Sequence, residues 1–378
     1  MKINEELADQ ILLNYDEAKS SYAGMVDITS NLLQTIISGA GIALHSVTSR
    51  CKDRQSLAKK LGVPGKSYKT LSDVTDIAGI RLTTYFADDV DKVAEIVRSE
   101  FAIDEGSSVD KRVQADPDRF GYLSLHYIAK LSKERSCLSE YKRFDGLKFE
   151  IQIRSILQHA WAEIEHDLGY KSGSAVPAEI KRRFARVSGL LELADSEFSA
   201  IRQQLDSYEK ELPSLLAVDK DIRPLDLPTL NLLMETDPDL RLLDLAVAEG
   251  AGAIISNSGE SAASWTVEKL ELLGVSTVGD LKDFSRKHLD DVRGFSEYWA
   301  RRDLGNVQVG IGIFYLCYVL LWASKDKGLA RQFVAKFWGE DSDYEQYDMA
   351  ADIMNYDPSV RGKRPQRMYD VFEEAGLE

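Results

Sequence analysis

Two carboxylates, Asp76 and Glu150, stand in strand-like segments whose other polar residues are mostly cationic or hydrogen-bonding. Carboxylate oxygens are the hard ligands that Mg²⁺ prefers, and proteins commonly bind Mg²⁺ through one or two of them together with substrate phosphates. The pair therefore predicts metal-dependent phosphate chemistry, with both residues as candidate metal ligands and catalytic groups.

Basic residues that would hold the phosphates stand nearby, several of them in the stretch SRCKDRQSLAKKL: Arg50, Lys52, Lys59, Lys60, Arg81 and Arg154. In a helix, Lys52, Ser56 and Lys60 would share one face, which suits a triphosphate that runs along it. The sequence contains no GxxxxGK[ST] and no GxGxxG motif. We therefore expect side chains, rather than a glycine-rich loop, to bind the phosphates.

The histidines favour no metal centre or nucleophilic triad. His159 and Glu163 lie one helical turn apart, but the segment is not HExxH, so hydrogen bonding is the expected role. Ser124 and His126 are two residues apart on one strand face, and no carboxylate accompanies them in sequence. Phosphate transfer without a covalent nucleophile remains the favoured chemistry.

Alternating residues predict the strands that position these groups. Apolar residues alternate with polar ones in 148–154, in 122–127 and between Asp76 and Tyr85, and helical patterns lie between and after them. We expect a central mixed β-sheet flanked by helices, a mixed α/β or α+β fold, with one face covered by helices and the other chemically active.

The chain has 378 residues, 44% hydrophobic and 29% charged, which excludes disorder and indicates more than one domain. Three prolines suggest a boundary, so we predict a first domain with an N-terminal helical segment at 1–210, a linker at 211–230 and a mainly helical, acidic domain at 231–378. The apolar run 307–323 predicts a buried helix, not a membrane span.

Three unpaired cysteines and no apolar leader favour the cytoplasm.

A long amphipathic helix is predicted over 180–205, because apolar residues recur there at alternating spacings of three and four. Two interpretations stay open: the seam packs along its own domain, or it pairs with a second copy of the chain. A basic cluster at the start of this helix, at 181–186, is either a solvated face or a surface for a phosphate backbone.

Five ordered motifs resemble those of the RelA/SpoT-type nucleotide pyrophosphokinases. RCKDRQSLAKK is similar to R-x-K-x-x-x-S-x-x-x-K, DIAGIR to D-x-x-G-x-R, GYLSLHY to G-Y-x-S-x-H, and FEIQIR with the following HAWAEIEHDLGYK to E-I-Q-I-R and its helix. The resemblance covers residues 40–210. It implies a nucleotidyltransferase-like domain that transfers the β,γ-pyrophosphate of ATP to the ribose 3′-hydroxyl of GTP or GDP, making (p)ppGpp and AMP in stringent-response signalling.

The resemblance also implies a role for each matching residue. Arg50 and Arg81 would sandwich the adenine of ATP, with Lys52, Ser56 and Lys60 on its phosphates. Asp76 would hold Mg²⁺, and Glu150 would assist the metal or take the proton of the 3′-hydroxyl. Tyr122 would stack on the acceptor base. The other residues implied on the acceptor side are His126, Gln152 and Arg154.

Departures from the family pattern leave the acceptor and the regulation open. Asp118 stands where family members that make (p)ppGpp commonly have a lysine, so the acceptor is either a guanine nucleotide, an adenine nucleotide or the 3′ end of tRNA, the last as in toxin members. Tyr344 and Tyr347 form a YxxY element that resembles one occupying the adenine site in fused toxin–antitoxin members, which implies restraint in cis. The pattern is also compatible with a protein activator, with a homo-oligomer and with a catalytically inactive nucleotide sensor.

Overall fold

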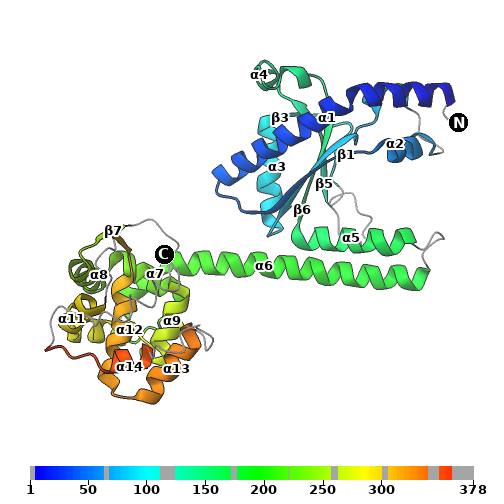
Figure 1. The fold of residues 1–378 in the computed structure, drawn as a ribbon. Helices are drawn as coiled ribbons and strands as arrows, with labels where there is room; N and C mark the ends of the chain where they lie inside the picture. Colours follow the sequence, from blue (N-terminus) through cyan, green and yellow to red (C-terminus); the bar gives the residue numbers. More distant parts are fainter. Residues whose placement is uncertain are drawn as a thin grey trace. The chain divides into compact units, whose positions relative to one another are not determined.

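The computed structural model describes residues 5–63, 68–110, 124–171, 177–219, 221–256, 263–299, 305–338 and 349–359 (Figure 1). The chain divides into two compact units, Met1–Gln204 and Leu205–Glu378. Each unit has its own cluster of buried apolar side chains. We call them the N-terminal unit and the C-terminal unit.

A mixed six-stranded sheet forms the centre of the N-terminal unit. Its strands follow the order β1-β2-β6-β5-β3, and β4 pairs with β5. β2 and β6 are parallel, whereas the other pairs are antiparallel. The bounds are β1 Leu44–Cys51, β2 Ala78–Thr84, β3 Phe101–Ile103, β4 Val109–Asp110, β5 Leu125–Leu131 and β6 Phe149–Ser155. The predicted fold class is confirmed.

Helices α1 and α3 cover one face of this sheet (Figure 1). Ile80 and Leu82 of β2 and Ile151 and Ile153 of β6 are fully buried on that face, because alternate residues of a strand point the same way. The polar residues between them therefore face away from the apolar core. The helices are α1 Glu5–Gly39, α2 Arg54–Leu61, α3 Asp88–Glu100, α4 Lys133–Ser136, α5 Ile156–Lys171 and α6 Ala178–Val218, with short 3₁₀ helices at Leu71–Asp73 and Lys142–Phe144.

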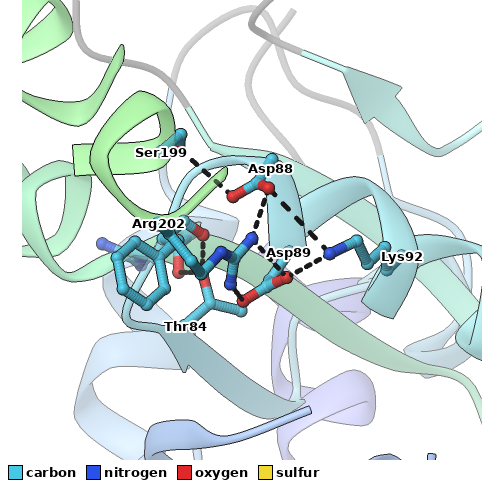
Figure 2. A network of polar contacts seen from close by, with 8 residues as sticks. Thr84, Asp88, Asp89, Lys92, Ser199 and Arg202 are labelled. Atoms are coloured by element: carbon cyan, nitrogen blue, oxygen red, sulfur yellow. Dashed lines mark hydrogen bonds and ion pairs between the residues drawn. The ribbon is translucent and has the colours of Figure 1, made fainter. Parts of the chain in front are cut away.

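Ion pairs attach α6 to the start of α3 (Figure 2). The Arg202 guanidinium contacts Asp88, donates from Nη1 to Asp89 Oδ2 at 2.6 Å, and stacks over the Phe86 ring at 4.2 Å. Ser199 Oγ donates to Asp88 at 3.1 Å. These bonds compensate the acidic first turn of α3 and hold α6 on the N-terminal unit.

A second attachment joins α6 to the end of β6. Ser155 Oγ donates to Asp195 Oδ2 at 2.6 Å, and Ser155 N donates to Gln158 Oε1 at 2.9 Å where α5 begins. Asp195 is 3% exposed, and burial raises its pKa to about 6. The carboxylate form of Asp195 is therefore disfavoured in the folded chain.

Replacing Asp195 with asparagine should stabilise the protein at pH 7.5. Because the folded pKa is higher than the unfolded one, Asp195 destabilises the fold increasingly between pH 4 and pH 6, by about 3 kcal/mol for a shift of about two units. Denaturant unfolding at pH 4, 5, 6 and 7.5 should show that the free energy of unfolding of the wild-type protein falls as the pH rises. Asp195→Asn should remove this fall. The exposed Asp206→Asn is the control. Equal pH slopes in Asp195→Asn and wild type would contradict the assignment.

The C-terminal unit is mainly helical, as predicted, around α12. Gly312 lies so close to α8 that a Cβ there would come within 2.5 Å of Leu243, and Asp244 accepts hydrogen bonds from the N–H groups of Gly310 and Gly312. The elements are α7 Leu227–Thr236, α8 Pro238–Ala251, β7 Ile254–Ser256, α9 Ala263–Leu272, α10 Val278–Lys287, α11 Leu289–Trp299, β8 Asn306–Gln308, α12 Ile311–Ser324, α13 Lys327–Trp338 and α14 Met349–Met354.

Two sequence expectations about this region have different outcomes. The apolar run at 307–323 forms the buried helix α12, as predicted, and no helix among the described residues is long and apolar enough to cross a membrane. Helix α6, in contrast, continues through Pro213 to Val218, so the first part of the predicted linker is helical. Proline in a helix interior removes one backbone hydrogen bond and crowds the carbonyl four residues earlier, which favours a kink or an end, but α6 continues past Pro213.

Candidate active site

The strand register brings the polar residues of β1, β2, β6 and β5 onto one face. Arg50 pairs with Gly79, and Gly79 pairs with Glu150, so the three positions form one row across the sheet. The next row contains Arg81, Gln152 and His126. Paired residues on neighbouring strands point to the same side, so these side chains converge.

A hollow lies over these rows. Gly79 has no side chain, which leaves space between the Arg50 and Glu150 positions. The hollow is lined by Thr48, Ser49, Arg50, Gly79, Ile80, Arg81, Glu150 and Gln152. The two arginines and the carboxylate make it suitable for an anionic ligand with a hydrogen-bonding group.

Asp76, just before β2, binds two lysines. Its Oδ1 lies 2.6 Å from Lys60 Nζ and its Oδ2 lies 3.2 Å from Lys52 Nζ. Burial alone would raise the pKa of Asp76, but the hydrogen bond from Lys60 and the positive charges of both lysines outweigh burial and hold the pKa below its usual range. The carboxylate is thus ionised at neutral pH, and the two cations are held beside it.

The helix predicted to carry Lys52, Ser56 and Lys60 begins later than expected. Asp53 is the N-cap of α2, and its carboxylate accepts hydrogen bonds from Ser56 N at 2.8 Å and Ser56 Oγ at 2.7 Å. Lys52 therefore lies between β1 and α2, not on the helix. The expectation of one shared helical face was wrong because it overlooked the N-cap aspartate. Lys52 and Lys60 still meet, at Asp76.

Glu150 is held by hydrogen-bonding neighbours on its own face of the sheet. His126 Nδ1 lies 2.7 Å from Oε1, and Gln152 Nε2 donates to Oε2 at 2.9 Å. Burial alone would raise the pKa of Glu150, and the charge of Asp76 adds to this. The hydrogen bond and charge of His126 and the bond from Gln152 outweigh both, so the pKa lies below its usual range.

Ser124 completes a chain of contacts that sequence reasoning missed. Its Oγ lies 2.7 Å from His126 Nε2, so Ser124, His126 and Glu150 follow one another through the two imidazole nitrogens. The sequence indicated that Ser124 and His126 share a strand face, but the carboxylate comes from β6, 24 residues away from His126. The signal that would have found it is the β5–β6 register.

Glu163 is a second residue whose position was not foreseen. Its Oε1 accepts from Arg81 Nη1 at 3.0 Å and lies 3.8 Å from His159 Nδ1. Burial lowers the pKa of His159, and the Arg154 charge lowers it further. Helix α5 thus supplies a carboxylate that orients Arg81 over the sheet.

Of the residues expected on the acceptor side, Arg154 lies among the described residues, whereas Tyr122 does not. Arg154 is 4% exposed and donates to Gln152 Oε1, and burial followed by the charge of Arg81 lowers its pKa. Arg154 thus lies on the same face as Glu150 and Gln152. Tyr122 and Asp118 lie outside the described residues, as do Tyr344 and Tyr347.

Comparisons with known proteins agree with the motif pattern. The family model for a region found in RelA/SpoT proteins matches residues 49–175. The chain is 32% identical over 170 residues to the GTP pyrophosphokinase YjbM of Bacillus subtilis (strain 168), covering 44% of this chain and 75% of that protein. It is 27% identical over 166 residues to the GTP pyrophosphokinase YwaC of the same organism, covering 43% and 76%.

Similar solved structures include the small alarmone synthetase 1 from Bacillus subtilis, at 26% identity, which covers 51% of this chain and 98% of that chain with a TM-score of 0.44. A GTP pyrophosphokinase family protein from Streptococcus pneumoniae is 28% identical, covers 52% and 96%, and has the same TM-score. The family match ends before the C-terminal unit begins. From its identity to YjbM over three quarters of that protein, the chain belongs to the RelA/SpoT family of nucleotide pyrophosphokinases.

Proposed function

We propose that this chain is a Mg²⁺-dependent ATP:nucleotide 3′-pyrophosphotransferase that uses GTP or GDP as acceptor and makes (p)ppGpp. The observation that carries the proposal is the presence of two ionised carboxylates with different neighbours, Asp76 just before β2 and Glu150 on β6. Asp76 is held by two lysines, and Glu150 is held by His126 and Gln152. The names of YjbM and YwaC support guanine nucleotides as acceptors.

The residues fit a divalent cation. The Asp76 charge raises the pKa of Glu150, so the two carboxylates are close enough to interact through their charges. Both offer the oxygen ligands that Mg²⁺ prefers. Asp76 and Glu150 would hold the ion, which when bound would neutralise phosphate charge.

On the donor side, Arg50 and Arg81 flank the hollow, and we assign them to the adenine of ATP. Lys52 and Lys60 would bind the phosphates. Both lysines contact Asp76, so the residues proposed to bind the phosphates lie beside a residue that would hold the metal. Ser56 lies in the first turn of α2, where its hydroxyl donates to Asp53. The donor site is therefore built from side chains, without a glycine-rich loop.

On the acceptor side, Glu150 would take the proton of the 3′-hydroxyl. The hydroxyl oxygen attacks the β-phosphorus of ATP, the bond between that phosphorus and the α,β-bridging oxygen breaks, and AMP leaves with the electron pair on its oxygen. The lowered pKa of Glu150 keeps the base ionised at neutral pH. Tyr122, His126, Gln152 and Arg154 are the residues assigned to the acceptor side.

Ser124→Ala should reduce kcat about ten- to a hundred-fold with little change in the KM for ATP, because loss of an outer hydrogen bond releases the imidazole that orients Glu150. Ser124→Thr keeps the hydroxyl and should retain most of the activity. Steady-state kinetics with varied ATP separate the two parameters. A kcat for Ser124→Ala within two-fold of wild type would remove Ser124 from this positioning role.

The 3′ end of tRNA is the second candidate acceptor. Asp118 replaces the family lysine before the acceptor tyrosine, and Lys181, Arg182, Arg183 and Arg186 are all exposed on α6. An exposed basic cluster can follow a phosphate backbone.

Restraint of either activity by the C-terminal unit is part of the same proposal, because this unit carries most of the net charge of −15.

The proposed function is tested with γ-labelled ATP, Mg²⁺ and full-length protein, with GTP, GDP, ATP and deacylated tRNA offered separately. We expect label on GTP or GDP. Label on tRNA alone would establish the second candidate, and label on no acceptor would contradict both.

A chain ending at Lys210, before Leu216 joins the C-terminal core, tests the restraint, since it should be more active. Equal or lower activity would contradict restraint in cis.

A further inference from the structure

Helix α1 carries a buried tyrosine whose hydroxyl reaches the candidate active site. Tyr15 is 0% exposed and belongs to the apolar core between α1 and the sheet. Its hydroxyl donates a hydrogen bond to the backbone carbonyl of Lys52 and lies 3.9 Å from Cys51 Sγ. A buried hydroxyl needs a hydrogen-bond partner. Here the partner is the carbonyl of a residue that we assign to the phosphates of ATP.

Lys52 lies between two elements, so contacts from other parts of the chain fix its backbone. β1 ends at Cys51 and α2 begins at Arg54. The Lys52 N–H donates to the Ile77 carbonyl at 2.7 Å, and the Tyr15 hydroxyl donates to the Lys52 carbonyl. The backbone of Lys52 is thus attached to the start of β2 through its N–H and to α1 through its carbonyl. Together these bonds determine where the lysine side chain begins.

The residue after Tyr15 makes a second contact with the same segment. Arg54 Nε donates to Asp16 Oδ2 at 3.0 Å, but the two side chains are 53% and 46% exposed, so this ion pair contributes little. Tyr15, in contrast, is buried, and burial raises its pKa to about 12. Its hydroxyl therefore keeps its proton at neutral pH and remains a donor. The buried hydrogen bond is the stronger attachment of α1 to this segment.

We infer that Tyr15 is a positioning residue for the donor site, whose hydroxyl holds the Lys52 backbone so that the lysine ammonium meets the phosphates of ATP. In the structure this ammonium lies 3.2 Å from Asp76. The inference rests on the proposed role of Lys52, and it extends the donor site to α1, outside the residues 49–175 that the family model matches.

The hydroxyl, and not the ring, carries this role. A phenylalanine ring would fill the same space in the core, so packing alone does not require a tyrosine. Without the hydroxyl, the Lys52 carbonyl loses its donor from α1 and must find another donor or turn toward solvent. Either change rotates the peptide that carries the lysine, and a small displacement of a positioning group is costly to binding and catalysis.

Tyr15→Phe tests the inference in the full-length protein. The Kd for α,β-methylene ATP with Mg²⁺, measured by titration calorimetry, should rise about ten-fold because the Lys52 ammonium is no longer held in place. The KM for ATP should rise by a similar factor, whereas the KM for GTP should stay within two-fold. A role in folding alone would lower the number of binding sites but not the affinity of each. Circular dichroism checks the fold.

Tyr22→Phe is the matched control. Tyr22 lies about two turns further along α1 and is 3% exposed, and its hydroxyl makes no hydrogen bond to the described residues. This variant should keep the wild-type Kd within two-fold. The inference is overturned if Tyr15→Phe also keeps the wild-type Kd, or if both variants weaken binding equally.

A double-mutant cycle shows whether Tyr15 acts through Lys52. Lys52→Ala removes the ammonium but keeps the backbone carbonyl, so the hydrogen bond from Tyr15 survives. In the Lys52→Ala background, Tyr15→Phe should therefore change the Kd by less than two-fold, against about ten-fold in the wild type. The same ten-fold change in both backgrounds would overturn the inference.

The same titrations separate this inference from the proposed function. Lys52→Ala alone should weaken binding of α,β-methylene ATP at least ten-fold. Wild-type affinity in Lys52→Ala would overturn the assignment of Lys52 to the phosphates, and the inference with it. If Lys52→Ala weakens binding but Tyr15→Phe does not, the donor site stands and only the role of Tyr15 is overturned.

Discussion

Asp76→Asn should reduce label transfer from ATP by at least about a thousand-fold, which corresponds to about 4 kcal/mol of transition-state stabilisation. The substitution keeps the size of the side chain but removes its charge. A neutral amide cannot serve as an anionic ligand for Mg²⁺, and it no longer compensates the charges of Lys52 and Lys60. Both the proposed metal and the alignment of the two lysines would be lost.

Asp73→Asn provides a matched control for this result. Asp73 lies three residues earlier and accepts hydrogen bonds from the backbone of Lys69 and Thr70 at 2.8 and 2.9 Å. Backbone bonds from Thr70 and Lys69 lower its pKa, so its replacement should reduce thermal stability. It should leave transfer per folded molecule within about two-fold. Asp76→Asn that retains a tenth of wild-type transfer would remove Asp76 from the metal role.

The sheet could be predicted well from the sequence because apolar and polar residues alternate along its strands. In 149–155, apolar residues on one face and Glu150, Gln152 and Arg154 on the other identified both the strand and its active face, and the structure confirms β6. The buried helix α12 was also predictable, because fourteen nearly uninterrupted apolar residues have few other stable positions in a globular chain. Strong, local periodicity is what these elements have in common.

Features that depend on contacts distant in sequence were not predictable in this way. The Ser124, His126 and Glu150 chain requires the register between β5 and β6, and the contact between Arg81 and Glu163 joins positions 82 residues apart. Pro213 lies inside α6, which the sequence did not indicate, because the preference of a single residue competes with the packing of a long helix. The orientation of the α6 seam also needed coordinates, since its spacing fits either a buried or an exposed helix face.

Glu150→Gln should lower kcat at pH 7.5 by at least about a thousand-fold, because the amide has no site for the proton of the 3′-hydroxyl. Gln keeps an oxygen and a similar length, so the neighbouring His126 and Gln152 lose little packing. The control is Glu165→Gln on α5, which is exposed and should keep wild-type transfer. Single-turnover measurement of label transfer avoids a contribution from product release.

The pH dependence of this variant separates a base from a metal ligand. Because the pKa of Glu150 lies below its usual range, wild-type transfer should not fall through protonation of Glu150 between pH 8 and pH 6. If Glu150 is the base, the residual rate of Glu150→Gln should rise about ten-fold per pH unit, since hydroxide must then remove the proton. A residual rate that is flat with pH but recovers with higher Mg²⁺ would instead assign Glu150 to metal binding alone, and the acceptor proton would have to leave through another group.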